Sequence, residues 1–169
     1  MLALMLIIIG IFLRFLPHTP NVTPVAAIAL FGAALLPTRR LALLVPLALM
    51  ITSDLFLGLH DIVAFTWGSV ILISLIGWSF KKSSKLSLVL GGSLASSALF
   101  FVITNFGVWA MGWYPSTLEG LKNCYMMAIP FFRTFLAGTL VYASALFGAY
   151  ALAARLIRQT KFARVLLTD

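Results

Sequence analysis

Charged residues are scarce in this chain. Only 9% of its 169 residues are Asp, Glu, Lys or Arg, whereas 62% are hydrophobic, and the mean hydropathy is +1.10. A soluble domain carries about 25% charged residues, so this chain has too few polar side chains to cover a surface in water. The scarcity excludes the soluble globular class and predicts a single transmembrane domain over residues 1–169.

Cysteine and catalytic motifs are nearly or wholly absent. Cys124 is the only cysteine, which excludes an internal disulfide. The sequence lacks the GxxxxGK(S/T), GxSxG and HExxH patterns of nucleotide-binding loops, serine hydrolases and zinc peptidases. We therefore expect neither an enzyme nor a resident cofactor. One alternative stays open, a metalloenzyme using His18, His60 and Cys124, although these residues lie on three separate segments without close ligand spacing.

Positive charge is the exception to the scarcity. Twelve Lys and Arg against four Asp and Glu give a net charge of +8. Most of these basic residues fall in two short loops and in a C-terminal tail at 155–169, and such clusters mark the cytoplasmic side of a membrane. No basic face interleaved with aromatic residues suggests a nucleic-acid partner. The nine clustered residues are Arg39, Arg40, Lys81, Lys82, Lys85, Arg155, Arg158, Lys161 and Arg164.

Apolar runs separated by short polar turns predict an all-α polytopic membrane protein with six transmembrane helices surrounded by lipid. Six crossings bring the nine basic residues to one side, so we expect a multi-pass protein with both termini in the cytoplasm. The predicted spans cover residues 1–16, 25–36, 41–57, 62–80, 86–111 and 130–154.

The loop between the fifth and sixth spans is predicted to carry its own short helix. This outer loop covers residues 112–128, and Ser116-x-x-Glu119 has the pattern of a capping box at the start of a helix on the membrane surface. Pro130 is expected to begin the sixth span. Asp61 is predicted to cap the fourth span in the same way as Ser116.

Polar and aromatic side chains gather at the outer ends of the predicted spans. An ionisable group at the centre of a membrane costs about 2.5–3.5 kcal/mol, and it persists when it pairs, faces water or binds a ligand. The concentration predicts an outward-facing cavity in which aromatic rings stack on a planar ligand and Arg133 meets a carboxylate or phosphate. Two alternatives stay open, an ion-pair network that only joins helices and an aromatic belt at the headgroups. The candidate ligand-binding residues are Arg14, Asp54, Asn105, Trp109, Tyr114, Cys124 and Arg133.

Five motifs resemble those of an uncharacterised family of small bacterial membrane proteins. They are PHTPNVTPVAAIALFG at 17–32, SD at 53–54, TNFGVW at 104–109, YPxTxxGLxxCY at 114–125 and IPFFR at 129–133. That family looks related to the substrate-binding S components of energy-coupling factor (ECF) vitamin transporters. The resemblance implies uptake of a small vitamin-like nutrient at the inner, or plasma, membrane of a bacterium.

The same resemblance implies partners for uptake. S components work with a transmembrane coupling protein and ATPases, and an Ala-x-x-x-Ala face helps them dock, so small-residue faces such as Ala29/Ala33 are the expected docking surface. Some corrinoid transporters that resemble S components place a Cys on cobalt, which makes the cobalt of a bound corrinoid at Cys124 the alternative to no cofactor. The alternative function is that of a structural or accessory subunit of a membrane complex.

Overall fold

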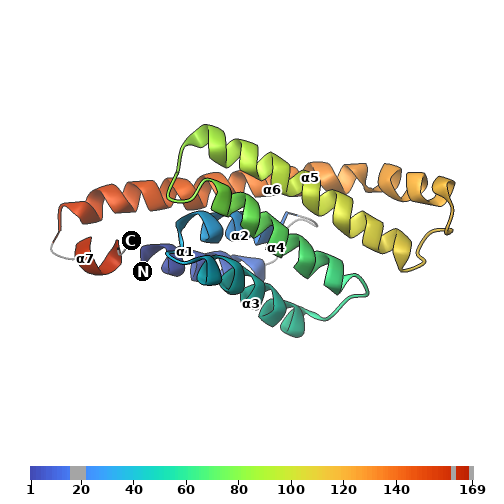
Figure 1. Cartoon of the computed structure of the whole chain (residues 1–169), viewed down its shortest axis with the longest axis horizontal. Coiled ribbons are helices and arrows are strands. Elements are labelled where there is room, and N and C mark those ends of the chain that lie inside the picture. The colour runs from blue at the N-terminus through green and yellow to red at the C-terminus, as the bar shows by residue number, and fades with distance from the viewer. Residues whose placement is uncertain (16–21, 161–162, 168–169) are drawn as a thin grey trace.

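Helices make up the described fold, which confirms the all-α class. The computed structural model describes residues 1–15, 22–160 and 163–167, and this part of the chain contains no strand. Each predicted apolar run forms a helix, and one short helix follows them. The helices are α1 (Leu2–Phe15), α2 (Val25–Leu35), α3 (Arg39–Leu57), α4 (Val63–Ser79), α5 (Leu86–Ala110), α6 (Leu118–Arg158) and α7 (Ala163–Leu166) (Figure 1).

Three of these helices, α3, α5 and α6, are long and apolar enough to cross a membrane by length and composition. Three more helices, α1, α2 and α4, are apolar but have only 14, 11 and 17 residues. These lengths are consistent with a membrane protein.

The two ends of the bundle differ in what they carry. Figure 1 shows the N-terminus, the end of α6, and the turns at 36–38 and 80–85 at one end. The turns at 58–62 and 111–117 lie at the other end, which we call the loop end. The two basic loops lie at the end of the bundle opposite the loop end; they carry Arg39, Arg40, Lys81, Lys82 and Lys85. The end of α6, which carries Arg155 and Arg158, lies at the same end.

The helix α6 corrects the prediction for the loop at 112–128. It begins at Leu118 and continues for 41 residues through Pro130, so a separate interfacial helix and a new span beginning at Pro130 are wrong. Proline inside a helix removes one hydrogen bond, which packed apolar helices tolerate. The capping residue is Thr117 and not Ser116, because the Thr117 hydroxyl accepts a hydrogen bond from the Gly120 N–H at 3.0 Å.

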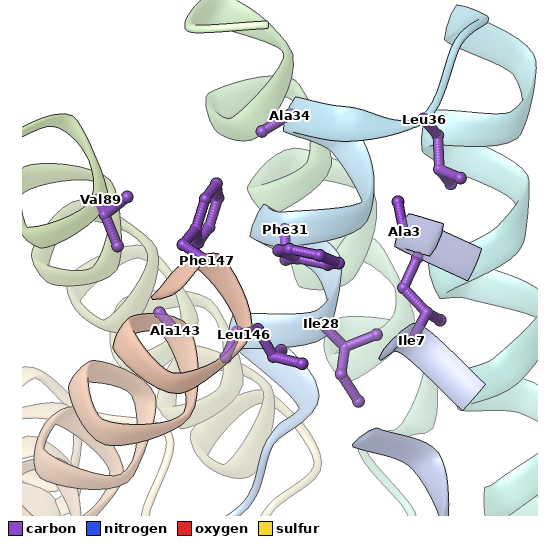
Figure 2. Packing of buried hydrophobic residues seen from close by; sticks show 11 residues of the cluster. Ala3, Ile7, Ile28, Phe31, Ala34, Leu36, Val89, Ala143, Leu146 and Phe147 are labelled. Carbon is purple, nitrogen blue, oxygen red and sulfur yellow. The ribbon is translucent and has the colours of Figure 1, made fainter. Parts of the chain in front are cut away.

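The helix α2 lies at the centre of the bundle and contacts α1, α3, α4, α5 and α6. Its residues Val25–Ala34 are all buried. Figure 2 shows Phe31 with Phe147 of α6 on one side and Ala3 and Ile7 of α1 on the other. The Phe31 and Phe147 rings meet edge to face with centroids 5.1 Å apart. In a membrane such packing, rather than water exclusion, holds helices together.

Small residues let the neighbours approach α2 closely. An added Cβ at Gly77 of α4 would lie 2.4 Å from the Leu30 carbonyl oxygen and 2.8 Å from the Ala33 Cβ. Ala29 and Ala33 are both 0% exposed. These side chains pack inside the chain itself, so the expected docking face at Ala29/Ala33 stays a prediction to which this packing gives no support.

The turn between α4 and α5 closes the C-terminal end of α2. The Lys82 N–H donates to the Ala34 carbonyl at 2.7 Å, and the Lys81 ammonium donates to the Pro37 carbonyl at 2.5 Å. Lys82 adopts a left-handed backbone with φ 61°, which non-glycine residues rarely do. That conformation costs on the order of 1 kcal/mol, and the hydrogen bond to an otherwise unpaired helix-end carbonyl offsets it.

Candidate functional site

A cavity of about 550 Å³ opens at the loop end of the bundle. Each of the helices α1 to α6 contributes to its wall. His60, Asp61 and Trp113 are exposed and therefore lie at the mouth, whereas Thr66 and Phe135 are buried and form the floor. The lining residues are Arg14, Thr23, Val25, Met50, Leu57, His60, Asp61, Ile62, Thr66, Phe100, Phe101, Thr104, Asn105, Val108, Trp113, Ala128, Phe131, Phe132 and Phe135.

One wall of the cavity is aromatic, and it comes from the antiparallel pair α5 and α6. Phe100 stacks on Phe135 with ring centroids 4.5 Å apart and an interplanar angle of 15°. Phe101 meets Phe132 with centroids 4.9 Å apart. Offset and tilted pairs of this kind are worth about 0.5–1.5 kcal/mol beyond their burial. These contacts hold the rings in place, so the cavity has a preformed aromatic wall.

The opposite wall contains a buried ionic network. Arg14 of α1 donates from Nη2 to Asp54 Oδ1 of α3 at 2.5 Å, and their side chains are 14% and 2% exposed. The second carboxylate oxygen accepts from the Trp67 indole N–H at 2.8 Å. Arg14 Nη1 also donates to Ser53 Oγ and contacts Met50 Sδ. The network joins α1, α3 and α4, and Arg14 also lines the cavity.

The mouth carries an acid that the sequence assigned to another role. Asp61 was predicted to cap α4, but the N-cap residue of this helix is Ile62, and no side chain forms a capping hydrogen bond there. The Thr66 N–H instead bonds to the Ile62 carbonyl at 3.0 Å and the Val63 N–H to the His60 carbonyl at 3.0 Å. The prediction for Asp61 is wrong, and its carboxylate lines the cavity beside His60.

The cavity includes some of the predicted ligand residues. Arg14 and Asn105 line it, and Asp54 lies behind Arg14. The Asn105 side-chain N–H₂ donates to the Phe101 carbonyl at 2.8 Å, which leaves its side-chain oxygen as a candidate acceptor for a ligand.

Trp109, Tyr114 and Arg133 are not part of the cavity wall. The Trp109 indole donates to the Pro115 carbonyl at 3.0 Å and so fastens the loop that follows α5. Tyr114 is half-buried in that loop. Arg133 is exposed on α6, and no ion pair of this residue occurs in the described part of the chain. The expectation that Arg133 meets a ligand stays a prediction, and it would place that ligand outside this cavity.

Cys124 is a packing residue between α5 and α6. It is 2% exposed, and its thiol donates to the Asn105 carbonyl at 3.3 Å. Gly120 and Ala128, one helical turn away on either side, are buried as well. Small side chains at this spacing let two helices approach closely. Cys124 does not line the cavity, so this site gives no support to a corrinoid cobalt at Cys124, and that alternative stays a prediction.

The metalloenzyme alternative requires a cluster of metal-ligating side chains. Among the residues that the structure describes, no three His, Cys, Asp or Glu side chains lie close enough to hold a metal ion. Of the three proposed metalloenzyme residues, His60 lies at the cavity mouth and Cys124 in the helix interface, while His18 lies outside the described residues.

Sequence reasoning missed the aromatic wall. The sequence feature that could have predicted this wall is a pair of Phe doublets on either side of the same short loop, Phe100-Phe101 and Phe131-Phe132. Two helices joined by a short loop run antiparallel and side by side, so doublets flanking the loop can meet.

A comparison with protein-family models identifies the group to which the chain is related. The model of DUF6580, a family of unknown function, matches residues 1–162. The chain belongs to this family. Membership in an uncharacterised family is thereby confirmed, and comparison with curated proteins and with solved structures gives no match. The DUF6580 description names no ligand.

Proposed function

We propose that this DUF6580 protein is a six-span membrane protein that captures a small, planar, vitamin-like nutrient for uptake. The observation that carries the proposal is the cavity of about 550 Å³ with a preformed aromatic wall and a few convergent polar groups. Ligand pockets are typically about 300–1,000 Å³, mostly apolar, with a small number of placed polar groups. The cavity matches that description in size and in composition.

The charge distribution supports an outward-facing cavity. The basic residues lie at the end of the bundle opposite the cavity, and basic segments mark the cytoplasmic side. In this arrangement both termini are cytoplasmic, and the mouth with His60 and Asp61 faces outside the cell or the periplasm. A nutrient then reaches the site without crossing the membrane first.

The short helices are compatible with six spans. At 1.5 Å per residue, α4 rises about 25 Å and α2 about 16 Å, against about 30 Å of hydrocarbon. Non-helical backbone is tolerated at membrane depth where protein or a water-filled cavity surrounds it. The buried position of α2 and the cavity beside its first turn satisfy that condition.

Uptake against a gradient needs energy, which this chain has no nucleotide-binding motif to supply. We propose that a transmembrane coupling protein with ATPases supplies this energy, following the resemblance to S components of ECF transporters. The burial of Ala29 and Ala33 gives no support to a contact through these two residues.

The proposal is tested by identifying what the purified protein holds. Protein extracted from cells grown in rich medium is expected to carry a stoichiometric small molecule, detected by native mass spectrometry. Phe132→Ala removes part of the aromatic wall and should lose the molecule. Phe56→Ala, which truncates a 78% exposed ring outside the cavity, should keep it.

Thermal shift gives an independent measurement. A ligand present at 100 times its Kd stabilises the folded state by about 2.7 kcal/mol, so a bound vitamin should raise the melting temperature of the wild type and not of Phe132→Ala. Folded protein that carries no molecule and responds to no vitamin in a panel contradicts the proposal. That outcome favours the alternative of an accessory subunit.

A further inference from the structure

The charge of the cavity wall is unevenly compensated. Among the described lining residues, the formally charged side chains are Arg14 and Asp61, with His60 as the titratable neighbour. A ligand that enters the cavity displaces water and strengthens every remaining electrostatic contact. Whether each of these charges is already paired within the protein therefore decides which ligand charge the cavity accepts.

The positive charge of Arg14 is already neutralised. Its guanidinium forms a 2.5 Å ion pair with Asp54, whose side chain is 2% exposed, and it donates to Ser53 as well. Moving Arg14 to a ligand would leave Asp54 as a buried carboxylate without its ion-pair partner, which is strongly unfavourable. Arg14 can offer a hydrogen bond to a ligand, but it does not give the cavity a net positive charge.

Among the residues that the structure describes, the negative charge of Asp61 has no such partner. No hydrogen bond or ion pair of Asp61 occurs within residues 1–15, 22–160 and 163–167, and Asp61 does not cap α4. Helix dipoles add little bias, because α2 and α4 begin at this end of the bundle while α1 and α3 end there. The described cavity wall, with the pair behind it, therefore carries an unbalanced carboxylate.

The aromatic wall favours the same ligand charge. Rings attract cations through their electron-rich faces, by about 0.5–1 kcal/mol at exposed sites and more where water is excluded. The cavity offers the Phe101 and Phe132 rings, and Trp113 stands at the mouth with Asp61. Aromatic faces together with one free carboxylate form the kind of site that binds organic cations.

We propose that the cavity selects a planar organic cation, an aromatic ring carrying a protonated or quaternary nitrogen that pairs with Asp61. The inference rests on the proposed function and narrows its ligand to one charge class. The ring of the ligand lies against the α5–α6 wall, and its nitrogen lies at the mouth between Asp61 and Trp113.

The experiment measures the affinity of three probes that share one ring and differ in charge. Tryptamine is a cation, tryptophol is neutral, and indole-3-acetate is an anion. Isothermal titration calorimetry of the detergent-solubilised protein is run at about pH 8, above the ordinary titration range of histidine. Tryptamine is expected to bind about tenfold more tightly than tryptophol, the size of one charged hydrogen bond. Indole-3-acetate should bind weakest.

Variants assign the preference to one side chain. Asp61→Asn should lower the affinity for tryptamine about tenfold and leave tryptophol within about twofold. Asp61→Lys should reverse the order of tryptamine and indole-3-acetate. Glu119→Gln is the matched control, since Glu119 is an exposed acid in the first turn of α6 that does not line the cavity, and it should change none of the three affinities.

Three results would overturn the inference: tightest binding of indole-3-acetate by the wild type, equal tryptamine affinity in wild type and Asp61→Asn, or no binding of any of the three probes. The co-purification experiment separates this failure from failure of the proposed function. A neutral or anionic molecule retained by the wild type and lost in Phe132→Ala would keep the capture function and reject the cation. A retained organic cation would support both.

Discussion

Replacing Asp54 by alanine tests whether the ionic network, and not only apolar packing, holds the loop end of the bundle together. Asp54 is 2% exposed and accepts from Arg14 at 2.5 Å and from Trp67 at 2.8 Å. The substitution leaves the Arg14 guanidinium, 14% exposed, without its counter-charge. It also leaves the indole N–H without an acceptor. Three helices, α1, α3 and α4, lose their common contact.

The expected loss follows from the burial of the pair. Breaking a buried ion pair by removing one partner costs about 3–5 kcal/mol. For a chain of this size, one kcal/mol corresponds to about 2–4 °C in melting temperature, so Asp54→Ala should lower it by about 6–20 °C. Asp54→Asn keeps an acceptor for Trp67 and should lose less. The double variant Arg14→Met with Asp54→Leu removes both charges and should recover most of the stability.

The assay is thermal unfolding in detergent micelles, followed by tryptophan fluorescence. Asp61→Ala is the control, because this exposed acid forms no hydrogen bond or ion pair in the described residues and its loss should stay within about 0.5 kcal/mol. If Asp54→Ala melts no lower than Asp61→Ala, the network does not stabilise the fold and the reasoning is refuted. The same holds if the double variant is as unstable as Asp54→Ala.

Three further predictions concern single positions. Gly77→Ala should destabilise the protein by about 1–3 kcal/mol, because the added Cβ lies 2.4 Å from a carbonyl oxygen of α2. Gly68→Ala on the same helix is the control, since its Cβ meets open space and the change should be neutral or stabilising. Similar melting temperatures of the two variants would contradict the predicted clash. Thr117→Ala should cost about 0.5–2 kcal/mol through loss of the α6 cap, and equal losses in Ser116→Ala would restore the capping-box assignment. Cys124, 2% exposed, should react with N-ethylmaleimide much more slowly than a cysteine placed at exposed position 116 in a Cys124→Ser background, and equal rates would show that the α5–α6 interface opens.

The sequence predicted the helices well because apolar runs and polar turns alternate clearly. The run expected at 86–111 forms α5, Leu86–Ala110, and the run expected at 41–57 forms α3, Arg39–Leu57. The prediction from the sequence failed at Pro130. Proline is a typical helix-starting residue, but here the apolar helix continues through it. Local preference was overridden there by packing along α5.

The candidate site was predicted only in part, because position along the chain does not determine which face of a helix a residue occupies. Successive residues of a helix are separated by about 100°. Phe132 and Phe135 therefore share a face with Ala128, which turns toward α5 and the cavity, whereas Arg133 points away. The choice of Trp67 as the partner of Asp54 depends on helix packing that no local pattern encodes.

The hydrogen bond from the Lys82 N–H to the C-terminal end of α2 has a consequence for biosynthesis. An 11-residue helix rises about 16 Å, about half of the hydrocarbon thickness, so α2 is a poor span on its own when it leaves the ribosome. The amide that satisfies its Ala34 carbonyl belongs to a turn translated only after α3 and α4. The C-terminal end of the central helix can therefore be completed only after the turn at 80–85 has been synthesised. A chain truncated before that turn would leave the Ala34 carbonyl without this hydrogen-bond donor.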